Sequence, residues 1–165
     1  MTKNPISAVA QANGLWLNGI LFDEKLPLGR YEILLGQPSR TIAAGPPAPV
    51  GHRYNQVHLY DAEGIYFTEH HATRLIDSVN FVFDKSVSPF QIARSFDGTL
   101  MVGEQRFQSG MSESDLSSQL FSRDLPGEFS AKCGRCWVGV STKCGRDFQG
   151  KRKNNRHVVL VSICI

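Results

Sequence analysis

Long apolar runs are missing from this 165-residue sequence, and so is an export signal of the usual kind. A helix that crosses a bilayer needs about 20 consecutive apolar residues, and no stretch of the chain comes near that length. Residues 1–14 contain one lysine, Lys3, and no apolar core of the kind that a secretory signal peptide carries. The sequence therefore predicts a protein that works in the cytoplasm.

The sequence also lacks the short motifs that mark common classes of enzyme. It contains no GxSxG turn for a serine nucleophile, no HExxH pair for zinc, and neither a GxGxxG loop nor a Walker-type loop for phosphates. Paired carboxylates such as Asp61 and Glu63 fall in turn-like sequence, where they are ordinary surface charges. We therefore predict a binding protein without a cofactor, and not an enzyme.

Acidic residues are scarce after residue 131. Residues 132–165 hold eight lysines and arginines but a single acid, Asp147, for a formal charge of +7, whereas residues 1–131 carry −4. A basic segment on an acidic body can attract nucleic acid or an acidic protein, and the alternative is a solvated basic loop. The residues of this basic surface are Lys143, Arg146, Lys151, Arg152, Lys153 and Arg156.

What the sequence does contain is one pattern that occurs twice. Asn18-Gly19 and Asp97-Gly98 each adjoin an apolar strand candidate, followed by a second short apolar stretch, a glycine and a helix candidate. Helices are expected within residues 26–36 and from Ser112 onward, where Asp115 completes a capping-box-like pattern. Residues 1–13 are expected to be frayed, residues 43–51 to be a stiff loop, and strands to lie at 15–22, 56–60, 65–68, 75–83, 99–102, 105–107, 136–142 and 157–165.

The order of these elements favours an α+β fold. Strands and helices do not alternate singly, which argues against a parallel βαβ architecture. We predict a single domain over residues 1–165 with a mostly antiparallel sheet and two short helices. It would be built from two similar ββα-ββ units at about residues 14–85 and 95–165.

Four cysteines allow an alternative that involves zinc. Cys133 and Cys136 form a CxxC pair, and Cys144 with His157 or Cys164 could complete four ligands if residues 134–142 bend sharply. If residues 136–144 form one extended strand instead, its ends lie about 26 Å apart and cannot share an ion. Plain thiols or one disulfide are the other interpretations of this segment.

Tyrosine and acidic residues cluster around a predicted hairpin turn at Asp61–Gly64. This composition is typical of a contact surface for another protein, with Tyr60, Asp61, Glu63, Tyr66 and Glu69 as the candidate residues. The alternative is that these tyrosines flank the core.

Several turn and core segments resemble small bacterial proteins that are encoded beside secreted toxins. The resemblance covers about residues 14–120 and is carried by residues 26–29, 35–39 (LGQPS), 60–65 (YDAEGI) and 96–100 (FDGTL). It implies an immunity protein that binds and occludes one cognate toxin of a type VI or contact-dependent system. The alternative function is a zinc-stabilised nucleic-acid-binding module that uses the basic, cysteine-rich region after residue 131.

Overall fold

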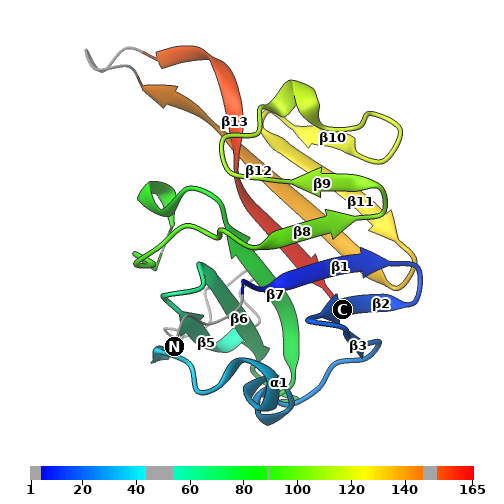
Figure 1. Ribbon diagram of the computed structural model, residues 1–165, viewed down its shortest axis with the longest axis vertical. Coiled ribbons are helices and arrows are strands. Elements are labelled where there is room, and N and C mark those ends of the chain that lie inside the picture. The colour runs from blue at the N-terminus through cyan, green and yellow to red at the C-terminus, as the bar shows by residue number, and fades with distance from the viewer. Residues whose placement is uncertain (1–4, 44–53, 89, 147–151) are drawn as a thin grey trace.

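Two β-sheets lie face to face in the computed structural model, which describes residues 5–43, 54–88, 90–146 and 152–165 (Figure 1). The smaller sheet has five strands in the order β3-β2-β1-β8-β9. Its strands are β1 (Ser7–Gln11), β2 (Gly14–Leu17), β3 (Ile20–Phe22), β8 (Thr99–Val102) and β9 (Gln105–Phe107). Adjacent strands in it are antiparallel except for β1 and β8, which run parallel.

The larger sheet has eight antiparallel strands in the order β10-β11-β12-β13-β7-β6-β5-β4. Its strands are β4 (Arg40–Ala43), β5 (Tyr54–Tyr60), β6 (Ile65–His70), β7 (Ile76–Val82), β10 (Ser122–Leu125), β11 (Glu128–Cys133), β12 (Cys136–Arg146) and β13 (Arg152–Cys164). The mostly antiparallel α+β class predicted from the sequence is confirmed.

The main core fills the space between the two sheets. Side chains alternate along each strand, so every second residue points inward. Leu17 and Leu100 from the smaller sheet meet Phe67, Phe81 and Val161 from the larger one, and all five side chains are fully buried. Apolar burial of this kind is the main favourable contribution to folding.

The predicted first helix forms as α1 (Leu28–Leu35). Tyr31 and Leu35, four residues apart on one face, are buried against the core, whereas Ile33 is 78% exposed. Gly36 ends the helix with φ +83°, and its N–H donates to the Glu32 carbonyl. This is the glycine stop that the sequence predicts. Within the described residues, no helix has the length and apolar character needed to span a membrane.

The predicted second helix does not form as an α-helix. A single 3-10 turn, η2 (Glu113–Asp115), follows Ser112, whose N–H donates to Asp115 Oδ2 at 2.9 Å as the capping pattern predicts. The helix goes no further because Leu116 is extended and the Ser117 N–H donates to the Gln105 side chain instead of a helical carbonyl. The serines at 112, 114, 117 and 118 favour such local bonds over helix propagation.

The two halves of the chain nevertheless follow one order of elements. A hairpin in the smaller sheet (β2-β3 or β8-β9) is followed by α1 or η2 and then by four antiparallel strands, β4–β7 or β10–β13. The large sheet joins the two sets of four through β7 and β13. Each half thus contributes four strands to this sheet, where the sequence predicted two or three.

The start of the chain departs from the prediction. Residues 1–13 were expected to be frayed, but β1 lies at the centre of the smaller sheet, between β2 and β8. Small alanines at positions 8 and 10 alternate with Val9 and Gln11, so the inward face of β1 carries little of the apolar bulk that marks a strand.

The predicted stiff loop at 43–51 lies, apart from Ala43, outside the described residues.

A second, smaller core lies on the outer face of the larger sheet. Val57, Leu59, Tyr66 and Val82 form it together with Ile92 from the segment that follows β7. This segment contains a 3-10 turn, η1 (Lys85–Val87), and it covers the β5–β7 half of the outer face. The outer face of the smaller sheet has no such cover among the described residues.

Candidate functional site

The tyrosines of the predicted contact hairpin are part of the core. Tyr60 is 1% exposed, packs edge-on against Phe67, and donates its hydroxyl to the Gly36 carbonyl at 3.1 Å. Tyr66 is 5% exposed and lies edge-on against Phe90 at a ring distance of 5.1 Å. Neither tyrosine therefore belongs to an exposed aromatic surface, because Tyr60 faces the main core between the sheets and the segment after β7 covers Tyr66.

The acidic residues of the hairpin tip have a structural task as well. Arg40 binds Asp61 through two nitrogens, at 2.7 and 3.1 Å, and also donates to the Phe90 carbonyl at 2.7 Å. The hydrogen bond from Arg40 lowers the pKa of Asp61. Asp61 thus holds the covering segment in place, and Glu63, also at the tip, is partly exposed.

Glu69, the fifth predicted contact residue, is buried in a polar network. Its Oε2 lies 3.1 Å from His58 Nε2, and the other imidazole nitrogen, Nδ1, lies 3.0 Å from Thr41 Oγ1. The guanidinium of Arg74 pairs with the second carboxylate oxygen at 2.5 Å. Hydroxyl, imidazole and carboxylate in a row are an arrangement that hydrolases use. Here His58 and Glu69 are 3% and 5% exposed as whole residues, and the network ties β4, β5 and β6 together.

The predicted zinc ligands are not brought together. Cys133 and Cys136 face each other across the turn between β11 and β12, but Cys144 lies near the other end of β12, opposite Arg156. His157 lies next to Arg156 on β13, and its Nε2 is 3.2 Å from Asp84 Oδ2. Across the ranges that the structure describes, no three Cys, His, Asp or Glu side chains are placed to hold one metal ion.

The predicted basic surface is divided between a projecting hairpin and the body. Figure 1 shows the ends of β12 and β13 extending beyond the two sheets, where Arg146 pairs with Arg152 in the strand register. Lys143 is exposed, whereas Arg156 is bound to the Thr142 carbonyl at 3.1 Å and to Glu113 at 3.2 Å. Lys151 lies outside the described residues, and for Lys153 only the strand is described.

A row of apolar side chains crosses the outer face of the smaller sheet. Trp16 lies directly opposite Val9 on one side and Leu21 on the other, and Val9 lies opposite Met101. All four side chains are partly exposed, and Arg106 on β9 ends the row. Directly opposed residues share a face of the sheet, so the row is continuous from β3 to β8. We call Leu21, Trp16, Val9 and Met101 the apolar row.

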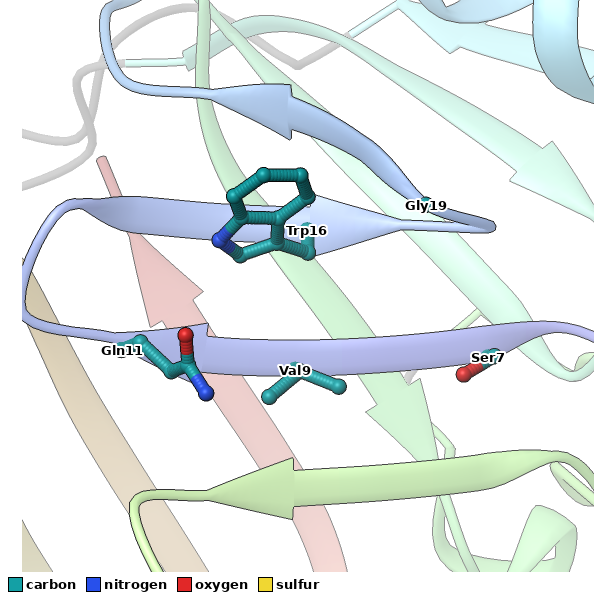
Figure 2. Close-up of a pocket in the computed structure, with 5 residues that line it drawn as sticks. All are labelled: Ser7, Val9, Gln11, Trp16 and Gly19. Carbon is teal, nitrogen blue, oxygen red and sulfur yellow. The ribbon is translucent and has the colours of Figure 1, made fainter.

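A shallow hollow of about 260 Å³ lies along this row (Figure 2). Figure 2 shows the Trp16 ring spread over the sheet, with Val9 and Gln11 on the neighbouring strand, and Ser7 and Gly19 complete the lining. The indole N–H donates to Asn13 Oδ1 at 3.2 Å, which fixes the ring. The described lining is apolar or uncharged, and such a surface is suited to binding.

Sequence reasoning missed the apolar row, although it placed Trp16 on a strand. The alternation of Val9 and Gln11 with alanines does indicate a strand at β1, but its partner strand β8 is 92 positions away in the sequence.

A second hollow, of about 210 Å³, lies on the larger sheet between the segment after β7 and strands β11–β13. Its polar lining consists of Asp84, Ser88, Glu128, Ser141 and Lys143.

Comparison with known proteins gives a family but no activity. One family model, described as "Domain of unknown function (DUF7738)", matches residues 9–117. No curated protein and no solved structure matches the chain. The matched range contains every residue of the apolar row, whereas the projecting hairpin and all four cysteines lie beyond it. Because the match spans well over half of the sequence, the protein belongs to this family of unknown function, DUF7738.

Proposed function

We propose that this protein is a cytoplasmic immunity protein, which binds a cognate secreted bacterial toxin and occludes it without catalysis or a cofactor. The toxin docks on the outer face of the smaller sheet. The observation that carries the proposal is the apolar row centred on Trp16, which stays partly exposed on a sheet face that no described element covers.

The composition of the row supports contact with a protein. Tryptophan, methionine and arginine are enriched in protein interfaces, and tryptophan is among the commonest residues that dominate binding energy. Trp16 is held by Asn13, and its strand is paired on both sides. A surface fixed in this way loses little conformational entropy when a partner binds.

Charge points to a partner with a basic surface. The part of the chain before residue 132 carries a formal charge of −4, and this part contains the whole smaller sheet. Complementary charge accelerates association and disfavours wrong partners. Toxins that act on nucleic acid need a basic cleft to bind it, so we infer that the cognate toxin is of this class.

We also infer that the two halves descend from one duplicated unit, which extends the predicted ββα-ββ order by two further strands. The shared order of hairpin, helical turn and four strands supports this inference, and η2 takes the place of the second helix. Such a duplicated scaffold provides a broad, stiff surface with no need for a reactive group.

The test compares the two tryptophans of the chain. Trp16 lies in the apolar row, and Trp137, which is 56% exposed on the larger sheet, is the matched control. With the toxin encoded beside this protein as the partner, Trp16→Ala should raise the Kd about 30-fold, as expected for a loss of about 2 kcal/mol at an interface centre. Trp137→Ala should leave the Kd within about twofold.

Protection of growing cells provides the second readout. Cells that express the toxin should survive with the wild-type protein and with Trp137→Ala, and should stop growing with Trp16→Ala. The melting temperatures of both variants must stay close to that of the wild type. Equal affinity of the two variants would reject the smaller sheet as the contact surface, and failure of the wild-type protein to bind the toxin would reject the immunity function.

A nucleic-acid-binding module is the second candidate, and the projecting β12–β13 hairpin is the observation that favours it. Lys143 is exposed on this hairpin, whose strand ends also carry Arg146 and Arg152. If this hairpin binds phosphates, the affinity for a labelled oligonucleotide should fall steeply as salt is added. Lys143→Glu should then lower the slope of log affinity against log salt concentration by about one released ion. Affinity that does not change with salt would exclude this function.

A further inference from the structure

Two thiols face each other at the turn between β11 and β12. Cys133 and Cys136 are directly paired in the antiparallel register, separated by Gly134 and Arg135. Gly134 has φ +59° at the first central position, as in the type II′ turns that close two-residue hairpins. Opposed residues in an antiparallel pair have Cα atoms about 4.5–5.5 Å apart, which lies within the range that a disulfide bridges.

Both side chains point toward the interior of the sandwich. Ala131 and Val138 lie two residues away from Cys133 and Cys136 along β11 and β12, so they share a face with the two cysteines, and both are buried in the core. Cys136 is fully buried and Cys133 is partly exposed, and both are free thiols. The two sulfur atoms are therefore on the same side of the hairpin, as a bond between them requires.

The turn that carries these thiols rests against the turn between β1 and β2. Cys133 Sγ donates to the Ala10 carbonyl at 3.4 Å, and the Arg135 N–H donates to the Ala12 carbonyl at 3.3 Å. Gly134 lies so close that an added Cβ would be 2.0 Å from the Ala12 oxygen. We call these contacts the turn–turn joint. It connects the larger sheet to the smaller one at the end of β1.

We propose that Cys133 and Cys136 are a redox-sensitive thiol pair, which a low-molecular-weight disulfide such as oxidised glutathione converts into a disulfide bond that opens the turn–turn joint. The joint opens because Cys133 Sγ turns away from the Ala10 carbonyl to reach Cys136 and loses the hydrogen that it donates. This inference is independent of the proposed function.

The oxidation is a pair of thiol–disulfide exchanges. The Cys133 thiolate attacks one sulfur of oxidised glutathione, forms a mixed disulfide, and releases one glutathione thiolate. Cys136 then loses its proton and attacks the Cys133 sulfur, which releases the second glutathione. Two protein thiols are oxidised to one disulfide, and one glutathione disulfide is reduced to two thiols. Cys133 reacts first because it is partly exposed, whereas burial raises the pKa of Cys136 to about 11.

The position of the pair predicts a bond that is easily reversed. A disulfide stabilises a fold mainly by closing a loop in the unfolded chain, and the gain is small when the loop contains only two residues between the cysteines. Weakly stabilised disulfides have higher reduction potentials and are the ones that respond to the surrounding thiol pool. The geometry thus fits a switch better than a permanent crosslink.

The experiment equilibrates the full chain in buffers of increasing ratio of oxidised to reduced glutathione. Free thiols are then trapped with N-ethylmaleimide, and the labels are counted by intact mass. The reduced protein has four cysteines to label, and the oxidised protein should lose the labels of Cys133 and Cys136 together. Peptide mapping should place the bond between these two residues, and Cys144→Ser and Cys164→Ser should still form it.

Hydrogen exchange provides the readout for the joint. Because the Arg135 amide donates to Ala12 in the closed joint, its exchange should become about tenfold faster in the oxidised protein and remain slow in Cys133→Ser under the same buffer. The proposal is overturned if no intramolecular bond forms in fully oxidised glutathione. It is equally overturned if the bond joins another pair, such as Cys136 and Cys164, or if the Arg135 amide exchanges at the same rate in both states.

Discussion

Replacing Gly134 by alanine should destabilise the protein far more than the same change at Gly110. Both glycines have positive φ, +59° and +78°, so each alanine carries the left-handed cost of about 1–2 kcal/mol. The surroundings differ. A Cβ at Gly110 meets nothing within 4 Å, whereas a Cβ at Gly134 would lie 2.0 Å from the oxygen of Ala12 and 2.2 Å from its Cα.

The difference between the two variants can be worked out from this overlap. Because backbone atoms cannot rotate away as a side chain can, the turn–turn joint must shift, which costs a further 1–3 kcal/mol or so by analogy with overpacked cores. We expect Gly134→Ala to lower the free energy of unfolding by about 3 kcal/mol and the melting temperature by roughly 6–12 °C. For Gly110→Ala we expect about 1 kcal/mol and roughly 2–4 °C.

Urea unfolding followed by circular dichroism measures both variants on the same scale, with thermal melts as a second measurement. If the two variants lose equal stability, the close approach of the two turns is not a feature of the folded protein. In that case the structural basis of the proposed thiol switch would also be removed.

Two further predictions concern buried and paired polar groups. The Tyr31 hydroxyl is buried with no hydrogen-bond partner among the described residues, whereas that of Tyr60 donates to a carbonyl. In urea unfolding, Tyr31→Phe should therefore leave the stability unchanged or raise it by about 1 kcal/mol, whereas Tyr60→Phe should lower it by about 1 kcal/mol. A larger loss in Tyr31→Phe than in Tyr60→Phe would contradict the hydrogen bonding described for these two hydroxyls. The pKa of Asp61 is lowered in the fold by Arg40, so this pair stabilises the protein above the unfolded pKa of about 3.9 and the contribution is lost as the pH falls through the folded value. In Asp61→Asn, the free energy of unfolding should therefore fall less steeply below about pH 5, by up to 1 kcal/mol for such an exposed pair. If the pH dependence below pH 5 is the same in the variant and the wild type, Asp61 does not have this role.

The strands that the sequence predicts correctly are those whose apolar residues alternate with polar ones or form a continuous run. The segment after His157 follows from its apolar character. The single strand expected at residues 15–22 is instead two strands, β2 and β3, because Asn18 and Gly19 both adopt positive φ and form a hairpin turn. The capping pattern at Ser112 could not reveal that the second helix is absent, because the cap itself forms as predicted. The helix does not continue because the Ser117 N–H donates to the side chain of Gln105, which lies on β9.

The candidate site depended on contacts that no local pattern contains. Tyr60 and Tyr66 look like surface residues beside acids, but Tyr60 is buried between the two sheets, and Tyr66 is buried because a distant segment with Phe90 and Ile92 packs over the outer face. The apolar row forms only when β8 pairs in parallel with β1, which places Met101 beside Val9. Sequence periodicity predicts which side of a strand is apolar, but it does not predict which strand becomes its neighbour.

The central position of β13 bears on how the protein is made. Since β13 lies between β12 and β7, the large sheet remains in two separate parts until residues 152–164 have left the ribosome. Until then the edge of β7, which carries Val79 and Phe81, is open to pairing with another nascent chain. Slow release or truncation within β13 should therefore be harmful through aggregation, even though none of the residues of the apolar row is touched.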